Sequence, residues 1–368
     1  MDSELGPLFP LFERERAAGR AMALGILVET VGSTYRKAGA MLLMASDGEY
    51  AGLISGGCLE GDLGERARAV IGHGRAALVE YDLRNADDLV WGLGLGCEGA
   101  MRILLLRVGP LEEWQPLAHL AAALAAHSPT AIGVVTESSD TATPVGALLL
   151  AATPGDAAPG DMRALPPGAH ALLEPDPLAA LAAAPHSGVV GRVEGPDARW
   201  RLLLLPLTLP PRLLLLGAGP DALPVVEFAA RLHWRVTVTD HRPAYAVPSH
   251  FPLAERVLEM RPEEIAQALD LGQFTAAVVM SHHLPSDLEY LRVLSASSLG
   301  YVGLLGPPAR REKLLSELGA DAELLRPRLH APVGLNLGGR TPEAIALAIV
   351  AEIHAFIHGT RQASSEHE

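Results

Sequence analysis

The feature that most constrains the fold is a glycine-rich turn between a short apolar run and a helix-forming stretch. The run Leu213–Leu216 leads into Gly217–Ala222, which reads G-A-G-P-D-A. The next apolar run ends at Asp240, 21 residues after Gly219. Glycines at these positions permit a tight turn and a close approach to phosphate, and the acid can accept a ribose hydroxyl. The pattern predicts a Rossmann-type unit with Gly217, Gly219 and Asp240 as nucleotide-binding candidates.

Two residues inside the turn leave NAD(P) binding open. Pro220 is tolerated in the first turn of a helix, but it lacks an N–H group that a phosphate could use. Asp221 adds negative charge close to the position that this phosphate would occupy. The pattern therefore predicts the fold without deciding whether a dinucleotide binds.

A proline pair, Pro210–Pro211, separates two differently patterned parts of the chain. After it, short apolar runs alternate with helical stretches, which is the pattern of a parallel sheet. We predict an α/β protein with an N-terminal α/β domain over 1–206, a Rossmann-type parallel-sheet domain over 211–360 and a disordered tail over 361–368. In the second domain, strands are expected at 213–216, 235–239, 276–280 and 301–304.

The N-terminal region contains an internal similarity. The stretch Ala131–Glu137 resembles Ala23–Glu29, and Pro144–Leu150 resembles Lys37–Leu43, so we predict a weaker second copy over about 131–206. Two buried strands of any α/β protein also look alike, which is the alternative to duplication. The second copy has no counterpart of the two cysteine-containing segments.

The chain has two cysteines, and both lie in glycine-rich segments. One segment is Ser55, Gly56, Gly57 and Cys58, and the other runs from Gly92 through Gly94 and Gly96 to Cys97. Glycine lets the backbone approach a ligand closely, so a thiol placed there is presented to a small molecule. The alternative is a free cysteine that packs in a turn as a small apolar residue. Because soft thiolates suit soft or sulfur-rich centres, both cysteines are candidate metal contacts, whereas the four ligands of a zinc site are missing.

Charged or polar side chains accompany glycines at three further points. Arg36 and Lys37 lie in a Gly-Ser-Thr loop, where the fork of Arg36 can bind phosphate. His282 lies at the end of an apolar run, and a single histidine contact to a polar ligand is favoured over a metal site built on a histidine pair. Arg310 follows Gly306 at a predicted helix start, which suits an anionic ligand or an exposed basic face.

The net charge of −14 limits the classes of partner. Nucleic acids and anionic membranes require a basic surface, so we expect neither as a partner. No apolar run is long enough to span a membrane, the N-terminal segment lacks a signal pattern, and two cysteines make no disulfide framework. We expect a cytoplasmic protein with free thiols.

Together these segments resemble the XdhC/CoxI family, accessory proteins of molybdenum hydroxylases such as xanthine dehydrogenase. The matching stretches are 32–41, 55–61, 92–97, 217–222, 236–243, 280–287, 301–306, 332–338 and 341–343. The resemblance implies a chaperone that binds molybdenum cofactor, as molybdopterin or its cytosine dinucleotide form. It also implies sulfuration of the cofactor with a cysteine desulfurase and its transfer to an apo-hydroxylase. Cys58 and Cys97 are then the candidates for contact with molybdenum or for sulfur handling.

Two other functions are left open by the residues. One is an NAD(P)-dependent oxidoreductase that uses the Rossmann unit and in which Asp240→Ala would change the selectivity of NAD(P) binding. The other is a nucleotide-binding scaffold with incidental thiols. We expect a maturation factor rather than an enzyme, and the family resemblance allows a homodimer.

Overall fold

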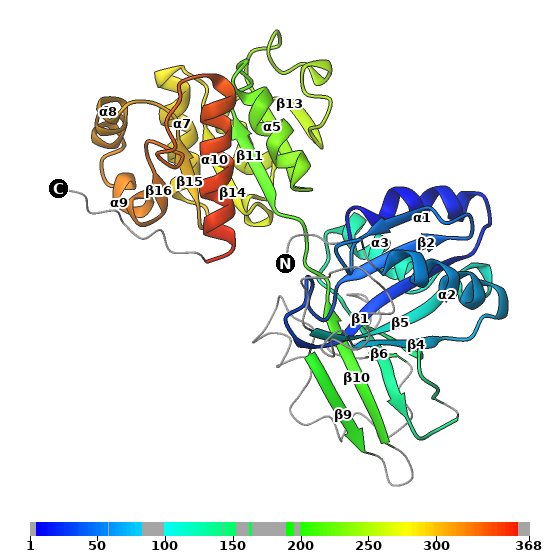
Figure 1. Cartoon of the computed structure of the whole chain (residues 1–368). Coiled ribbons are helices and arrows are strands. Elements are labelled where there is room, and N and C mark those ends of the chain that lie inside the picture. Colours follow the sequence, from blue (N-terminus) through cyan, green and yellow to red (C-terminus); the bar gives the residue numbers. More distant parts are fainter. Residues whose placement is uncertain are drawn as a thin grey trace. The chain divides into compact units, whose positions relative to one another are not determined.

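A computed structural model describes residues 5–57, 59–82, 99–141, 143–151, 162–163, 189–194 and 199–359. The contacts divide the chain into two compact units, Met1–Leu209 and Pro210–Glu368. Figure 1 labels the helices and strands of both units. The predicted tail 361–368 lies outside the described residues.

The first unit contains a five-stranded antiparallel sheet, as far as its described residues show, in the order β3-β2-β1-β5-β4. Its strands are β1 (Met22–Gly32), β2 (Met41–Ala45), β3 (Tyr50–Gly52), β4 (Ala77–Asp82) and β5 (Gly99–Val108). Helix α1 (Leu8–Ala17) precedes the sheet, and α2 (Glu60–His73) connects β3 to β4.

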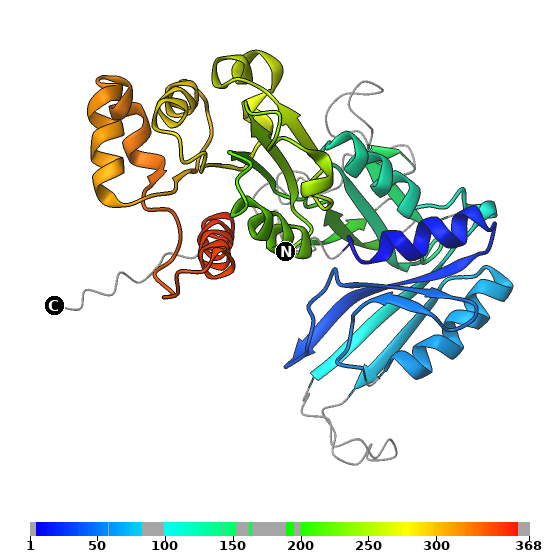
Figure 2. The same ribbon diagram turned by 90° about the horizontal axis from the view of Figure 1, so that it is seen from above.

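Both faces of this sheet are covered, which explains why β1 is apolar without alternation. Leu24 and Ile26 pack in one core with α1, whereas Ala23 and Leu27 pack in another core with α2. Successive strand residues point to opposite faces, so a strand buried on both sides needs apolar residues throughout. Figure 2 shows α1 and α2 on opposite faces of this sheet.

A second antiparallel sheet repeats the first, strand for strand. Within the part of the chain that the structure describes, its order is β8-β7-β6-β10-β9. The strands are β6 (Ala131–Ser138), β7 (Leu148–Ala151), β8 (Met162–Arg163), β9 (Val189–Glu194) and β10 (Arg199–Pro206), and α3 (Leu117–Ala126) lies between the two sheets in sequence. This order matches the first sheet position by position, as expected for two copies of one lobe.

The two sheets also share an irregularity in their central strand pair. The pairing of β1 with β5 skips Val28, and the pairing of β6 with β10 skips Thr136. Each skipped residue directly precedes a glutamate, Glu29 or Glu137, which pairs with an arginine of the neighbouring strand. A bulge that recurs at the equivalent position is unexpected for two strands that are similar only because both are buried.

The second unit is a parallel sheet with helices on both faces, which confirms the predicted fold class. In the described residues the strand order is β13-β12-β11-β14-β15-β16. The strands are β11 (Arg212–Leu216), β12 (Arg235–Asp240), β13 (Arg256–Glu259), β14 (Ala276–Val279), β15 (Val302–Leu304) and β16 (Leu329–His330). The helices are α5 (Ala222–Arg231), α6 (Ile265–Ala268), α7 (Leu284–Ser295), α8 (Pro308–Leu318), α9 (Asp321–Leu325) and α10 (Pro342–Ile357).

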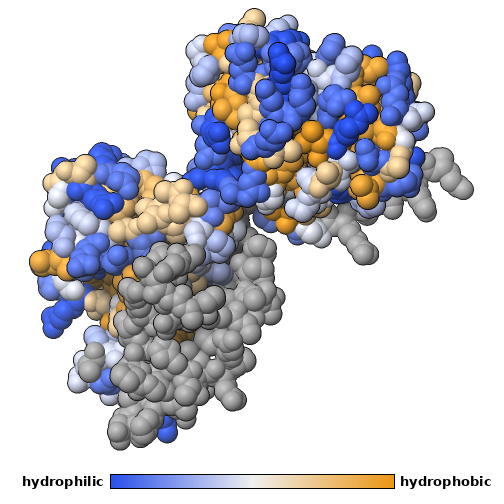
Figure 3. Space-filling view, turned by 180° about the vertical axis from the view of Figure 1, so that it is seen from behind, coloured by the Kyte–Doolittle hydropathy of each residue, from blue (hydrophilic) through white to orange (hydrophobic). Residues whose placement is uncertain are grey.

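Alternate residues of β11 belong to different cores of the second unit. Leu213 and Leu215 pack with α5 and α10, and Leu214 and Leu216 pack with α6, α7, α8 and α9. Figures 1 and 2 show α5 and α10 side by side on the first of these faces. In Figure 3, hydrophilic residues are interspersed with small apolar patches on the face of this unit that is in view. No helix among the described residues has the length and apolar character to cross a membrane.

Candidate functional site

Two strands of the first sheet end, and a third begins, at the same edge of that sheet. Strand β1 ends there at Gly32, which pairs with Gly99, the first residue of β5. Strand β3 ends there at Gly52, which pairs with Leu42 near the start of β2. The loop 33–40, the described residues of 53–59 and the first residue of β5 therefore lie at one edge, which we call the loop edge.

The loop that carries Arg36 and Lys37 is held close to the first sheet. Thr34 Oγ1 donates a hydrogen bond to the Arg36 carbonyl at 2.8 Å, and Lys37 is exposed. A Cβ at Gly99 would lie 2.5 Å from the Ser33 carbonyl oxygen, so only glycine allows β5 to begin beneath this loop. The predicted pair of cations thus lies at the loop edge.

The turn before α2 is organised by a buried serine and a buried glutamate. Ser55 Oγ donates to Glu60 Oε2 at 2.5 Å, and the Ser55 and Leu59 amides donate to the same carboxylate. Ser55 Oγ also accepts from the Gly57 amide at 3.3 Å. These bonds satisfy the backbone N–H groups of Ser55, Gly57 and Leu59, which precede the first residue of α2. Ser55 is therefore a positioning residue of the turn.

The two glycines of this turn face open space. Nothing lies within 4 Å of a Cβ placed on Gly56 or Gly57, and Gly57 has a φ of 106°, which favours glycine. Cys58 follows directly but lies outside the described residues, as do Gly94, Gly96 and Cys97. The roles of the two thiols stay a prediction. The described residues that follow them in the sequence, Leu59 and Gly99, belong to the loop edge.

In the second unit, the glycine turn packs against the end of a neighbouring strand. Gly217 has a φ of 128°, and a Cβ there would lie 2.6 Å from the carbonyl carbon of Met280. This close approach explains the glycine without a ligand. A Cβ on Gly219 would lie 2.6 Å from Asp221 Oδ1, so the geometry of the turn also accounts for the glycine at this position.

The carboxylate of Asp240 is fully buried and accepts hydrogen bonds from neighbouring residues of the same unit. The Ala218 amide donates to Oδ2 at 2.9 Å, and the Arg242 amide donates to Oδ1 at 3.0 Å. The Arg242 guanidinium adds bonds of 2.9 Å to Oδ1 and 2.7 Å to Oδ2. Burial acts to raise the pKa of Asp240, but these hydrogen bonds outweigh it and hold the pKa below its usual value.

These contacts do not fit NAD(P) in the ordinary Rossmann pose. Each oxygen of Asp240 already accepts two hydrogen bonds, so a ribose hydroxyl would have to displace Arg242 or the Ala218 amide. The Ala218 amide points to Asp240 instead of a phosphate, and Pro220 has no N–H to offer. Arg242 is the residue that sequence reasoning missed, although its position two residues after the acid is visible in the sequence.

The predicted histidine site lies in a loop and not at a strand end. Strand β14 stops at Val279, and His282 adopts a φ of 59°. Its Nε2 lies 2.7 Å from Asp221 Oδ2, which ties this loop to the glycine turn. The next residue, His283, bonds through Nδ1 to Ser286 Oγ at 2.9 Å. The described residues contain no group of three or more side chains suited to a metal ion.

Arg310 forms an ion pair with an aspartate of the neighbouring helix. Its Nε and Nη2 lie 3.1 and 2.5 Å from Oδ2 of Asp287, which is fully buried and also accepts a hydrogen bond from Ser281. Arg310 therefore compensates a buried charge, and its role as a contact to an anionic ligand stays a prediction. An anionic ligand would have to share this guanidinium with Asp287.

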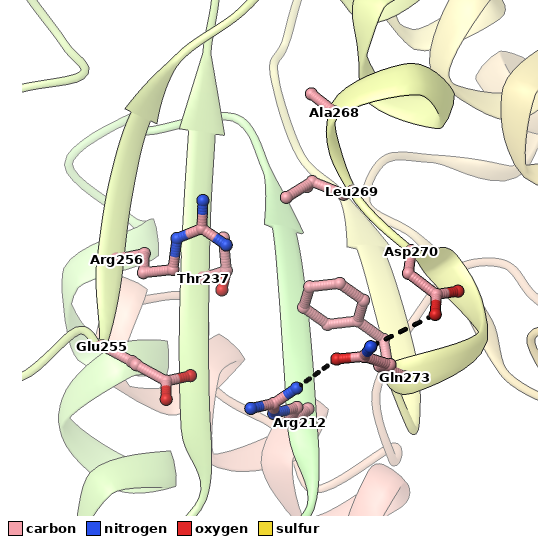
Figure 4. A pocket seen from close by; sticks show the side chains of 9 residues that line it. Arg212, Thr237, Glu255, Arg256, Ala268, Leu269, Asp270 and Gln273 are labelled. Carbon is pink, nitrogen blue, oxygen red and sulfur yellow. Dashed lines mark hydrogen bonds between the residues drawn. The ribbon is translucent and has the colours of Figure 1, made fainter. Parts of the chain in front are cut away.

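A pocket of about 260 Å³ lies near the amino ends of the parallel strands (Figure 4). Arg212 of β11, Thr237 of β12 and Arg256 of β13 line one side, and the segment 268–274 contributes the other. Arg212 donates to Gln273 at 2.6 Å. None of the predicted site residues lines this pocket. In this unit, Gly217, Gly219, Asp240 and His282 lie at the opposite, carboxyl ends of the parallel strands.

The fold and the loop edge define a class of protein in which a glycine-loop α/β lobe precedes a Rossmann unit. Two family models match the chain, the "XdhC and CoxI family" over residues 15–82 and the "XdhC Rossmann domain" over residues 213–353. The chain belongs to the XdhC and CoxI family, which confirms the resemblance seen in the sequence.

Relatives support the same family over nearly the whole chain. The chain is 32% identical over 333 residues to a probable xanthine dehydrogenase subunit of Bacillus subtilis, covering 90% of this chain and 91% of that protein. It is 24% identical over 342 residues to "Molybdenum cofactor insertion chaperone PaoD" of Escherichia coli, covering 91% of this chain and 83% of PaoD. A crystal structure described as a xanthine dehydrogenase from Bacillus halodurans is 29% identical, with a TM-score of 0.76 and 98% of both chains covered.

Proposed function

We propose that this protein is a chaperone that binds molybdenum cofactor and inserts it into a molybdenum hydroxylase. Membership of the family supports the proposal, as does the similarity to PaoD, whose name describes this role. The structural observation that carries it is the loop edge, where the glycine turn before α2, a cationic loop and the first residue of β5 lie at one end of a sheet.

The residues of the loop edge divide the binding task between them. Gly56 and Gly57 leave open space beside exposed backbone, where a flat ring system can approach. Arg36 and Lys37 provide the positive charge for a cofactor phosphate, and the Gly57 and Leu59 amides of the turn before α2 are already bonded to Ser55 and Glu60. Cys58 and Cys97 would supply soft thiolate contacts to molybdenum.

The finer proposals concern the cofactor's form and the partners. The cargo is molybdopterin or its cytosine dinucleotide form, and it gains a terminal sulfur from a cysteine desulfurase while it is bound. An apo-hydroxylase such as xanthine dehydrogenase is the acceptor, and the chaperone acts as a homodimer. The relatives named for xanthine dehydrogenase and for cofactor insertion support the acceptor class.

The test is retention of cofactor by protein purified from a host that makes it. We expect the protein to carry molybdenum and a pterin and to increase reconstitution of an apo-hydroxylase. Cys58→Ala and Cys97→Ala should each lower retention, whereas Ser298→Ala, an exposed loop variant in the other unit, should not. A wild-type protein that carries no pterin and does not aid reconstitution would overturn the proposal. Normal retention by both cysteine variants would remove the thiols from it.

A further inference from the structure

A second pocket lies in the first unit, at the end of the first sheet opposite the loop edge. Its volume is about 570 Å³, within the usual range for small-molecule sites. Ala76, Leu106, Val145 and Leu148 form apolar walls. The polar lining residues are Arg75, Arg107, Glu112 and Gln115.

One wall of the pocket comes from the second copy of the lobe. The segment Pro144–Leu148 corresponds to the loop that carries Lys37 in the first copy. A Cβ on Gly146 would lie 2.5 Å from the Ala76 Cβ, so the second copy packs directly on the first at this point. The duplication thus creates a cavity between the copies that neither sheet could form alone.

The polar side of the pocket contains a loosely matched ion pair. Arg107 Nη1 lies 3.5 Å from Oε1 of Glu112, which belongs to the 3₁₀ turn Pro110–Glu112. Arg107 Nε and Glu112 Oε2 are buried and have no hydrogen-bond partner. Buried polar atoms are nearly always paired, so these two call for an explanation. The exposed Arg75 gives the lining an excess of positive charge.

We propose that this pocket binds a free α-amino acid with an apolar side chain. The ammonium nitrogen and the carboxylate carbon of an amino acid are about 2.5 Å apart, because both are bonded to one carbon. Such adjacent charges match the adjacent Glu112 and Arg107, and a small rotation of each side chain would complete its hydrogen bonds. The apolar side chain would lie against Leu106 and Val145. This proposal does not depend on the function of the loop edge.

The first test varies the ligand and leaves the protein unchanged. Calorimetry or saturation-transfer NMR with cofactor-free protein should show saturable binding of L-leucine. L-leucine methyl ester lacks the carboxylate and 4-methylpentanoate lacks the amine, so each should bind at least about tenfold more weakly. Equal binding of all three, or no saturation by L-leucine at millimolar concentration, would overturn the proposal.

The second test varies the pocket. Arg107→Met and Glu112→Gln should each weaken L-leucine binding at least about tenfold. Arg231→Met is the matched control, because this exposed arginine belongs to the second unit and should leave binding unchanged. Thermal melting shows whether each variant is folded. Unaltered affinity in folded Arg107→Met and Glu112→Gln would show that the pair is only structural.

Discussion

Arg201 of the second sheet forms an ion pair with Glu29 of the first, with Nη2 3.1 Å from Oε1. The reverse pair also exists, because Arg102 of the first sheet lies 2.9 Å from Glu137 of the second. Arg102 and Arg201, and likewise Glu29 and Glu137, hold equivalent positions in the two sheets. The contact is therefore reciprocal, as in a two-fold symmetric interface between identical protomers.

Glu29→Gln should lower the stability of the first unit, because it removes the negative charge that pairs with both Arg102 and Arg201. The side chains are 31% exposed for Glu29 and 22% for Arg201, so we expect a loss of about 1 kcal/mol in the free energy of unfolding. Urea denaturation measures it. Glu13→Gln is the control, since Glu13 is 57% exposed and lies 3.8 Å from its partner, Arg16. An equal effect of both substitutions would contradict a special role for the pair.

Stability should fall in acid partly through Glu15. Hydrogen bonds from Arg20 lower the pKa of this buried carboxyl most, and those from Arg14 add to this, so it reaches about 2. A lowered folded-state pKa stabilises the fold above the usual value near 4.5, and this stabilisation is lost as the pH falls towards 2. Wild type should lose roughly 1–3 kcal/mol more over this window than Glu15→Gln. Parallel acid titrations of the two proteins would argue against it.

Gly217→Ala should destabilise the second unit strongly. The added Cβ would lie 2.6 Å from the Met280 backbone, and the φ of 128° is unfavourable for alanine. A loss of about 2 kcal/mol or more is expected in chemical denaturation. Gly300→Ala is the matched control, because its nearest neighbour is the Phe356 ring edge at 3.3 Å and its φ is ordinary. Comparable losses for the two variants would disprove the close-approach argument.

Both carboxylate oxygens of Asp240 already accept two hydrogen bonds each, so we expect that the second unit does not bind NAD⁺ in the ordinary Rossmann pose. Calorimetric titration of the wild-type protein with NAD⁺ should give no saturable heat. Asp240→Asn should lower the free energy of unfolding by about 2–4 kcal/mol, because Arg242 and the Ala218 amide lose their charged acceptor. Saturable NAD⁺ binding that Asp240→Asn abolishes would restore the oxidoreductase hypothesis.

The parallel sheet was predictable because its central strands are apolar and its glycine turn has a fixed spacing from Asp240. The edge strands β13 and β16 escaped prediction since Arg256–Glu259 is half charged and Leu329–His330 is only two residues long. Edge strands are buried less, so their sequences carry a weaker pattern. The similarity of Ala131–Glu137 to Ala23–Glu29 was visible in the sequence because both are continuous apolar runs, and both form strands in the same position of their sheets.

The partners of the candidate site residues could not be predicted in the same way. Arg310 and Asp287 are 23 residues apart, and only the packing of α8 beside α7 brings them together. Likewise, Asp240 resembles a ribose ligand until the fold places Arg242 on both its oxygens. Sequence motifs report which side chains are present at a sheet edge. Which of them are already used by the protein is decided by tertiary contacts.

The reciprocal ion pairs between the repeated sheets have a consequence for assembly. If two molecules exchanged their second lobes, each Glu29 would meet the Arg201 of its neighbour in the same geometry as in one chain. Such a swapped dimer would keep this network intact and would need only a rearranged connection between the lobes. A dimer formed by exchange of second lobes would therefore be sought in concentrated preparations of the protein.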